Sequence, residues 1–116
     1  MVIMNKRLII GLLVKVKFIG PLSEKEVIAR VDTGAQSSSV DSSLAQKLGL
    51  VKTGNTKTIK SASGVGKRDV VRASIEVEGR RLDELFTIVD RTHMKYQALI
   101  GQDILKKEKF LIDPLL

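Results

Sequence analysis

A strict alternation of apolar and polar residues near the middle of the chain constrains the fold more than any other feature. Val71, Ala73, Ile75 and Val77 are apolar, and the residues between them are an arginine, a serine and a glutamate. A period of two places the apolar side chains on one face of a strand and the polar ones on the other. This segment is therefore predicted to be a β-strand with one face in a core and one in water.

Other short apolar segments, separated by turn residues, surround this strand. We expect strands before Gly20-Pro21 and at Val27–Val31, Thr56–Ser61, Leu82–Val89, Ala98–Ile100 and Lys109–Ile112. A short helix is expected from about Asp41 to Leu48, with Asp41 or Ser42 as N-cap and Gly49 as its end, and a helical turn at Ile104 and Leu105. The sequence thus predicts an all-β fold, a small closed β barrel with one or two short helices.

Length and composition limit the classes of protein that remain. The 116 residues suffice for one domain, which we place at residues 1–116. The absence of cysteine excludes disulfide scaffolds and thiol catalysis, and a single histidine, His93, cannot form a multi-histidine metal site. Low aromatic content argues against a base-stacking surface for nucleic acid. No apolar run approaches the roughly 20 residues that span a bilayer, so we expect a cytoplasmic protein without a membrane partner.

The segment from Ala29 to Ala35 carries the chemistry of interest, because a carboxylate and a hydroxyl follow a buried strand. The order is Asp32, Thr33 and Gly34, and such a turn can direct backbone N–H groups toward the carboxylate. The same three residues are also common in ordinary Asx turns at strand ends. The tripeptide alone leaves both interpretations open.

A wider set of motifs resembles the retropepsin-like aspartic peptidases, the single-lobe family that includes retroviral proteases. The Asp-Thr-Gly-Ala signature stands at Asp32–Ala35, and a Leu-Ala-x-x-Leu-Gly-Leu helix end follows at Leu44–Leu50. The segment from Ala98 to Leu105 looks like the second signature of the family. The resemblance covers nearly the whole chain and implies the barrel fold and a peptidase activity.

The resemblance also implies a role for individual residues. Asp32 would be the catalytic residue, Thr33 would cross-link two active-site turns, Gly34 would contact the catalytic carboxylate and Ala35 would lie along the substrate. Leu99, Ile100 and Gly101 would pack against the catalytic turn. The flap that covers substrate would comprise Ser61, Ala62, Ser63, Gly64, Val65 and Gly66, of which we expect Ser63–Gly66 to form the turn.

A closer resemblance is to retropepsin-like relatives described as ATP-dependent zinc proteases, one of which is linked to removal of glutamate residues from a ribosomal protein. The similar segments are Thr87–Met94, Ala98–Gly101 and Phe110–Pro114. This chain has no phosphate-binding glycine-rich loop with its lysine and no set of metal ligands. We therefore expect no cofactor and no metal.

Aspartic peptidase chemistry requires two carboxylates that share one proton across a bound water. The chain has one Asp-Thr-Gly and is too short for a second lobe, so a second copy must supply the other Asp32. We therefore expect a homodimer with a two-fold axis between the two carboxylates. Retroviral members brace this dimer with an acidic residue and an arginine, where this chain has Gln36 and Gln102. A pair of glutamines lacks charge-assisted strength, which leaves the dimer affinity open.

Two alternatives to a peptidase function remain open from the sequence. The chain could be a catalytically weak or inactive module of the same fold that binds peptides or dimerises, or a basic domain that associates with nucleic acid, although no binding motif for the latter is visible. Asp90, Asp103 and Asp113 are alternative carboxylates, for which structural roles are expected, as for His93. With 20 Lys and Arg against 13 Asp and Glu, the charge of +7 favours an acidic peptide or protein as substrate.

Overall fold

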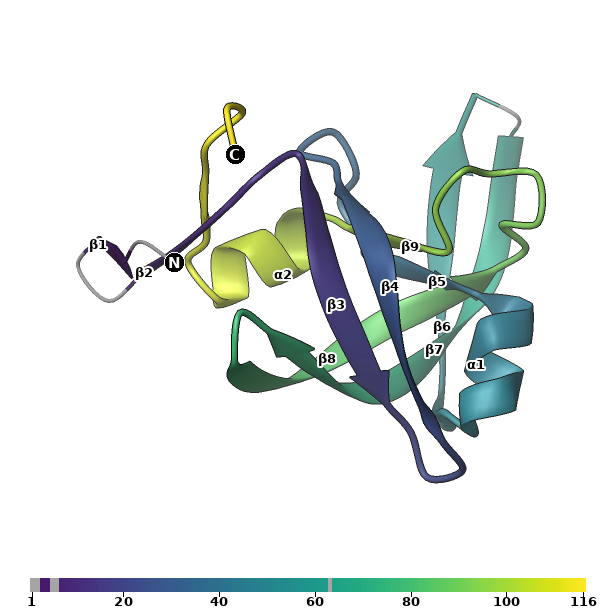
Figure 1. The fold of residues 1–116 in the computed structure, drawn as a ribbon. Helices are drawn as coiled ribbons and strands as arrows, with labels where there is room; N and C mark the ends of the chain where they lie inside the picture. Colours follow the sequence, from purple (N-terminus) through teal and green to yellow (C-terminus); the bar gives the residue numbers. More distant parts are fainter. Residues whose placement is uncertain (1–2, 5–6, 63) are drawn as a thin grey trace.

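The computed structural model describes residues 3–4, 7–62 and 64–116. Six strands form the body of the protein (Figure 1): β3 (Leu13–Ile19), β4 (Glu24–Val31), β5 (Ser39–Asp41), β7 (Gly64–Val77), β8 (Arg80–Val89) and β9 (Ala98–Ile100). Their order is β3-β4-β9-β5-β8-β7, and β7 pairs back to β3 through residues 74–76 and 17–19. The sheet is therefore closed, which confirms the predicted all-β barrel.

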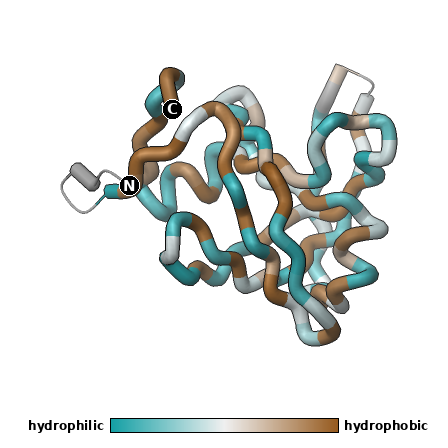
Figure 2. The backbone as a smooth tube through the Cα atoms, in the orientation of Figure 1, coloured by the Kyte–Doolittle hydropathy of each residue, from teal (hydrophilic) through white to brown (hydrophobic). Residues whose placement is uncertain are grey.

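The core lies inside this barrel and is built largely from alternate residues of the longer strands, whereas all three residues of β5 are buried. In β7 the buried residues are Val71, Ala73, Ile75 and Val77, as the alternation predicts. Figure 2 shows the same alternation as brown and teal segments along the strands. The rings of Phe18 and Phe86 meet at the centre, with 5.1 Å between their centroids and a tilt of 59°.

The hairpin of β6 (Val51–Ser61) and β7 extends past the barrel body. Its two strands pair from Val51 and Arg72 to Ser61 and Gly64, with an irregular register between Lys52 and Thr56. The predicted turn at Ser63–Gly66 is wrong in its extent, because Gly64, Val65 and Gly66 belong to β7. Cross-strand hydrogen bonding continues almost to the tip, and the connection contains only Ala62 and position 63, which lies outside the described residues.

Two short helices close the ends of the barrel. Helix α1 (Ser42–Leu48) begins at Asp41, whose Oδ2 accepts a hydrogen bond from Leu44 N, and ends at Gly49, which has a φ of 70°. The N-cap and the glycine end agree with the expectation from sequence. Helix α2 (Gln102–Lys107) follows β9 directly after Gly101 and buries Ile104 and Leu105 against the core.

A second, small sheet joins the two ends of the chain. It consists of β1 (Ile3–Met4), β2 (Arg7–Ile10) and β10 (Leu111–Ile112), and β10 runs parallel to β2. The strand predicted at Lys109–Ile112 is shorter than expected, because Lys109 adopts a φ of 56° that a strand does not accommodate. The apolar stretch before Gly20 forms two strands, which separate at residues 11–12.

A search for helices with the length and apolar character to cross a bilayer, made over the described residues, found none.

Candidate active site

Asp32 lies directly after β4, where that strand ends beside β9. The two strands run parallel with Val31 opposite Ile100, and the Asp32 N–H donates to the Ile100 carbonyl at 2.9 Å. On the other side, the Val31 N–H donates to the Leu12 carbonyl at 2.9 Å. The backbone at Asp32 is therefore fixed, while Asp32 itself is half-buried and open to solvent.

The turn after Asp32 holds the orientation of its carboxylate. The Gly34 N–H donates to Asp32 Oδ1 at 2.9 Å, and the Ala35 N–H donates to the Asp32 carbonyl at 3.3 Å. A backbone donor at this distance fixes the orientation of the Asp32 carboxylate. Thr33 and Gly34 are exposed and Ala35 is half-buried, so the tip of the turn is open to another molecule.

The segment Leu99–Gly101 lies against this turn, and Gly101 makes the closest approach. A Cβ atom at Gly101 would lie 2.8 Å from the Ala35 carbonyl oxygen and 2.9 Å from the Ser37 carbonyl carbon. The next residue, Gln102, donates its N–H to the Ala35 carbonyl at 2.8 Å. Glycine is required at position 101 because the backbone of the turn after Asp32 occupies the space of a side chain.

A second contact between the turn and α2 involves Ser38 and Asp103. Ser38 Oγ donates to Asp103 Oδ1 at 2.6 Å, and the Ser38 N–H donates to both carboxylate oxygens at 3.0 and 3.1 Å. Ser38 Oγ also accepts from the Gly101 N–H at 2.9 Å. Ser38 is fully buried, so this network fixes the far end of the turn that follows Asp32. From the sequence, Asp103 is expected to be an acidic residue of the helical turn or an alternative second carboxylate, and its hydrogen bonds to Ser38 are not predicted.

The loop between β8 and β9 is held by Arg91. Its backbone N–H donates to Asp41 Oδ1 at 2.8 Å, its Nε to the Tyr96 carbonyl at 2.8 Å and its Nη1 to Ser39 Oγ at 3.3 Å. Burial would raise the pKa of Asp41, but hydrogen bonds from Ser43, Arg91 and Leu44 outweigh it and lower the pKa. The charged form of this buried carboxylate therefore organises both α1 and the loop that precedes β9.

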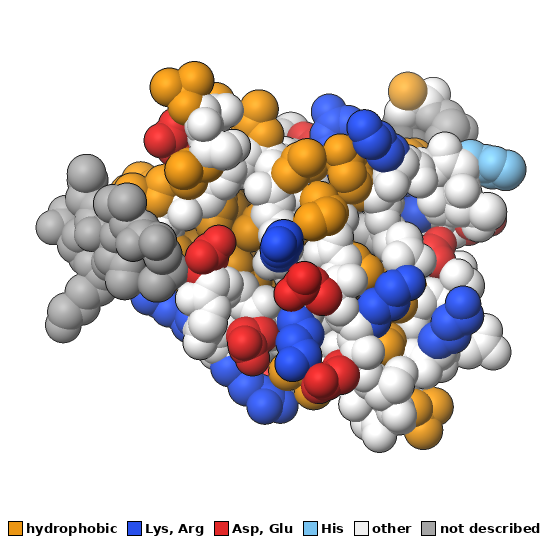
Figure 3. All heavy atoms as spheres, in the orientation of Figure 1, with side chains coloured by type: hydrophobic (Ala, Val, Ile, Leu, Met, Phe, Trp, Pro, Cys, Tyr) orange, Lys and Arg blue, Asp and Glu red, His pale blue; other side chains and the backbone are white. Residues whose placement is uncertain are grey.

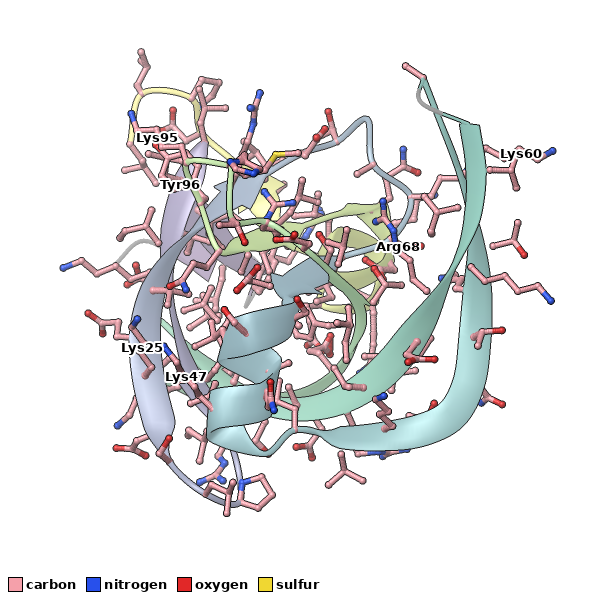
Figure 4. All side chains as sticks on the ribbon, turned by 90° about the vertical axis from the view of Figure 1, so that its right-hand side faces the viewer. Lys25, Lys47, Lys60, Arg68, Lys95 and Tyr96 are labelled. Atoms are coloured by element: carbon pink, nitrogen blue, oxygen red, sulfur yellow. The ribbon has the colours of Figure 1, made fainter. Side chains whose placement is uncertain are left out.

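Arg91 lies within electrostatic range of Asp32 and of two further arginines, Arg30 and Arg68. Burial lowers the pKa of Arg91, and the positive charges of Arg68 and Arg30 lower it further, whereas Asp41 and Asp32 raise it. On the hairpin, Arg68 is half-buried although its neighbours at positions 67 and 69 are exposed. Figure 4 shows Lys60 on the outer side of the hairpin and Arg68 on the side that faces the middle of the molecule.

The predicted flap residues lie at the end of this hairpin. Ser61 ends β6, Ala62 is in the turn, and Gly64, Val65 and Gly66 begin β7. The Val65 side chain is 69% exposed. A Cβ at Gly66 would meet nothing within 4 Å. The tip is therefore largely open to solvent at Val65 and has open space around Gly66, and a role of this segment as a flap stays a prediction.

The other carboxylates that the sequence singled out have local structural contacts. Asp90 accepts hydrogen bonds from the backbone and hydroxyl of Thr92, and Asp113 Oδ1 accepts from the Leu115 N–H at 2.9 Å. His93 is exposed. Over the described part of the chain, no three His, Cys, Asp or Glu side chains are grouped to hold a metal ion.

Gln36 and Gln102, which replace the charged pair of retroviral members, do not contact one another through their side chains in any hydrogen bond of the described residues. Gln102 Nε2 donates to the Thr33 carbonyl at 2.7 Å, within the same chain. The Gln36 carbonyl accepts from the Asp103 N–H at 3.2 Å, and its side chain is exposed. Gln102 thus braces its own catalytic turn.

Exposed hydrophobic side chains lie on the same side of the barrel as the turn. Figure 3 shows a group of them over the start of β3 and the end of β4, and a further group near the C-terminus. Large hydrophobic residues with exposed side chains in these two segments include Leu12, Leu13 and Ile28 of the β3–β4 region and Leu115 and Leu116 at the C-terminus, with exposed fractions between 38% and 94%. An apolar group of this kind beside a polar turn is characteristic of a surface that another protein covers.

Comparison with known proteins agrees with this geometry. The sequence model of the family described as "gag-polyprotein putative aspartyl protease" matches residues 20–107. The chain is similar to DNA damage-inducible protein 1 of Saccharomyces cerevisiae, with 33% identity over 91 residues that cover 75% of this chain. It spans about one fifth of that relative, 21% of its length.

Solved structures show the same fold. A Legionella pneumophila protein of unknown function superposes with a TM-score of 0.67 at 20% identity, covering 94% of this chain and 95% of that one. The EIAV protease in complex with the inhibitor HBY-793 gives a TM-score of 0.64 at 18% identity, with 94% and 96% covered. Together with the family match, these likenesses show that the chain belongs to the retropepsin-like aspartyl protease family.

Proposed function

We propose that the protein is an aspartic endopeptidase that acts as a homodimer, with one Asp32 from each chain. The observation that carries the proposal is the Asp32 carboxylate itself, which is half-exposed and oriented by the Gly34 N–H at 2.9 Å. Two such carboxylates that face one another would share a proton and bind one water. One would take the proton of the water as it attacks the scissile carbonyl, and the other would donate a hydrogen bond to the carbonyl oxygen.

Three features support self-association in this geometry. Thr33 and Gly34 are exposed at the tip of the turn, and an exposed hydrophobic surface with Leu12 and Leu13 lies beside it. Leu115 and Leu116 at the C-terminus would extend the same interface. Because Gln102 braces its own turn and not that of a partner, we expect an affinity below that of an arginine–carboxylate pair.

We further propose that the substrate is a peptide or protein with an acidic residue close to the scissile bond. Arg68 on the inner side of the hairpin, with Arg30 and Arg91, would provide the complementary positive charge. The formal charge of +7 acts in the same direction at long range. Replacement of Arg68 by glutamine should reduce cleavage of acidic peptides more than that of neutral ones. Lys60→Gln, on the outer side of the same hairpin, is the matched control.

The test of catalysis is peptide cleavage by purified Asp32→Asn protein. We expect the variant to remain folded and to lose cleavage, because the amide cannot take a proton from water, whereas Asp83→Asn on the exposed side of β8 should leave cleavage intact. The wild-type rate should be bell-shaped in pH. Retention of full activity by the Asp32 variant would refute the proposal.

A catalytically inactive module of the same fold is the second candidate, favoured by the use of Gln102 within its own chain. Sedimentation at low micromolar concentration, with and without peptide, distinguishes the two. A protein that stays monomeric under both conditions, yet binds peptide without cleaving it, would support the binding module.

A further inference from the structure

Glu84 is a buried acidic residue that the proposed chemistry does not use. It lies in β8 between Leu82 and Phe86, which both face the core, and its side chain is 1% exposed. Ala73 of β7 is its cross-strand neighbour and provides no polar atom on its side chain. A carboxylate in such a place is costly unless it is paired or protonated.

Its partners come from the last turn of α2 and the residue that follows. Lys107 Nζ donates to Glu84 Oε1 at 2.6 Å and to the Asp83 carbonyl at 2.7 Å. The same Nζ lies 3.8 Å from Glu108 Oε2. The Glu84 and Glu108 carboxyls therefore meet at one ammonium group, and the nearby Glu108 carboxyl raises the pKa of Glu84.

The influences on the pKa of Glu84 do not cancel, and their net effect is a raised pKa. Burial raises the pKa of Glu84 most, Glu108 raises it further, and Lys107 opposes both, with a result of about 7. Lys107 is 60% exposed, and it is shared among two carboxyls and one carbonyl. The neighbouring Asp83 carboxylate points to Ser74 of β7, to which it is hydrogen-bonded at 2.8 Å. On the side of the terminal sheet, Arg7 of β2 donates to the Lys109 carbonyl at 2.7 Å.

This carboxyl pair connects the barrel to two functional parts of the molecule. At its start, α2 holds the catalytic turn through Gln102 and Asp103. At its end, the chain turns at Lys109 and enters β10, which pairs with β2. Detachment of the last turn of α2 from β8 would therefore loosen the terminal sheet and remove a support of the turn.

We propose that the Glu84–Glu108 pair is a proton-dependent contact that docks the end of α2 and β10 on the barrel. While Glu84 is protonated, its contact with Lys107 beside Glu108 holds the two elements together. When that proton is lost, two carboxylates face each other with one partly solvated lysine between them, and the end of α2 is released. The consequence for activity rests on the proposed peptidase function, whereas the release itself does not.

The sign of the pH effect follows from the folded and unfolded states. The folded protein retains the proton at higher pH than the unfolded chain, in which a glutamate has an ordinary value of 4.5. Stability from this pair is therefore complete below that value and is lost as the pH rises toward about 7. We expect the Tm of the wild-type protein to fall by about 5 to 10 °C over this range.

The experiment measures thermal unfolding and amide hydrogen exchange of the full chain across this pH range, with exchange corrected for its intrinsic pH dependence. Glu84→Gln imitates the protonated acid and should abolish the fall in Tm. Glu108→Gln removes the repelling charge and should reduce the fall. Glu26→Gln, at an exposed position of β4, should behave as the wild type. Faster exchange should be confined to residues 102–112 and to β2 (Arg7–Ile10), which pairs with β10.

An unchanged fall in Tm in both Glu84→Gln and Glu108→Gln would overturn the proposal, as would a wild-type protein whose exchange at residues 102–112 is constant with pH. If Glu84→Gln does not fold, the proposal is tested by the fall in Tm of Glu108→Gln alone, because Glu108 is partly exposed and its replacement should be tolerated. Neither readout requires cleavage, so failure of the peptidase proposal would leave this result interpretable.

Discussion

Replacement of Gly101 by alanine tests how tightly β9 and α2 hold the catalytic turn. Gly101 has a φ of −101°, which alanine also adopts, so the substitution causes no backbone strain. Its effect is steric, because the new Cβ would lie 2.8 Å from the Ala35 carbonyl oxygen and 3.0 Å from the Ser37 carbonyl oxygen. Restoring the first contact to an ordinary 3.4 Å requires a displacement of 3.4 − 2.8 = 0.6 Å.

The displaced atoms are backbone atoms, so the catalytic turn must move as a unit. The Ala35 carbonyl also accepts the Gln102 N–H at 2.8 Å, and that hydrogen bond would be distorted. Overpacking of this kind costs about 1–3 kcal/mol, which corresponds to a fall in Tm of roughly 4–12 °C in a domain of this size. Misplacement of a catalytic group by a fraction of an ångström should lower kcat about tenfold or more.

Calorimetry and peptide cleavage together check this prediction. Gly66→Ala is the control for stability, because its Cβ would meet nothing within 4 Å. We expect the control to unfold within about 1 °C of the wild type, since exposed substitutions change stability little. A Gly101→Ala protein with wild-type Tm and wild-type kcat would show that the turn accommodates the methyl group, and the argument for a rigid catalytic turn would fail.

Two further substitutions test the contacts around the site. Ser38→Ala leaves the Gly101 N–H and one side of Asp103 without their partner, and should cost about 1–3 kcal/mol in urea unfolding, whereas Ser37→Ala should cost less. Asp41→Asn should cost about 1 kcal/mol at neutral pH, because the amide keeps one acceptor oxygen where Asp41 accepts from Arg91 N–H on one oxygen and from Leu44 N–H on the other. Because the pKa of Asp41 is lowered from 3.8, its contribution exists above that value and disappears on acidification. The stability difference between wild type and Asp41→Asn should therefore shrink in acid, and a difference independent of pH would contradict it.

The parts of the fold that the sequence predicts are those that depend on local pattern. Alternation identifies β7, and the sequence from Asp41 to Gly49 identifies α1 with its N-cap and its glycine end. The sequence-based predictions fail where contacts between residues far apart in the chain determine the structure. Pairing with β6 extends β7 back to Gly64, and the contact of Ser38 with Asp103 spans 65 positions in sequence. Nothing near either residue indicates that contact.

Glu84 differs from these cases, because a signal for its position exists in the sequence. The alternation of Leu82, Glu84 and Phe86 places a glutamate where the strand faces the core. A charged residue at a core-facing position of an alternating strand indicates that it has a specific polar or charged partner. Such a residue differs from Asp32, whose position at a strand end fits both an active site and an ordinary turn.

The catalytic turn and the Glu84–Glu108 pair are connected through one short helix, and this connection explains why α2 carries so many polar contacts. Side chains from its six residues hydrogen-bond the Thr33 carbonyl, the buried Ser38 hydroxyl and the buried Glu84 carboxyl. A helix of this length has little stability of its own. Its position is therefore set by these contacts and by the burial of Ile104 and Leu105. A change of charge at one end can thus alter the support of the catalytic turn at the other, without any change in the barrel.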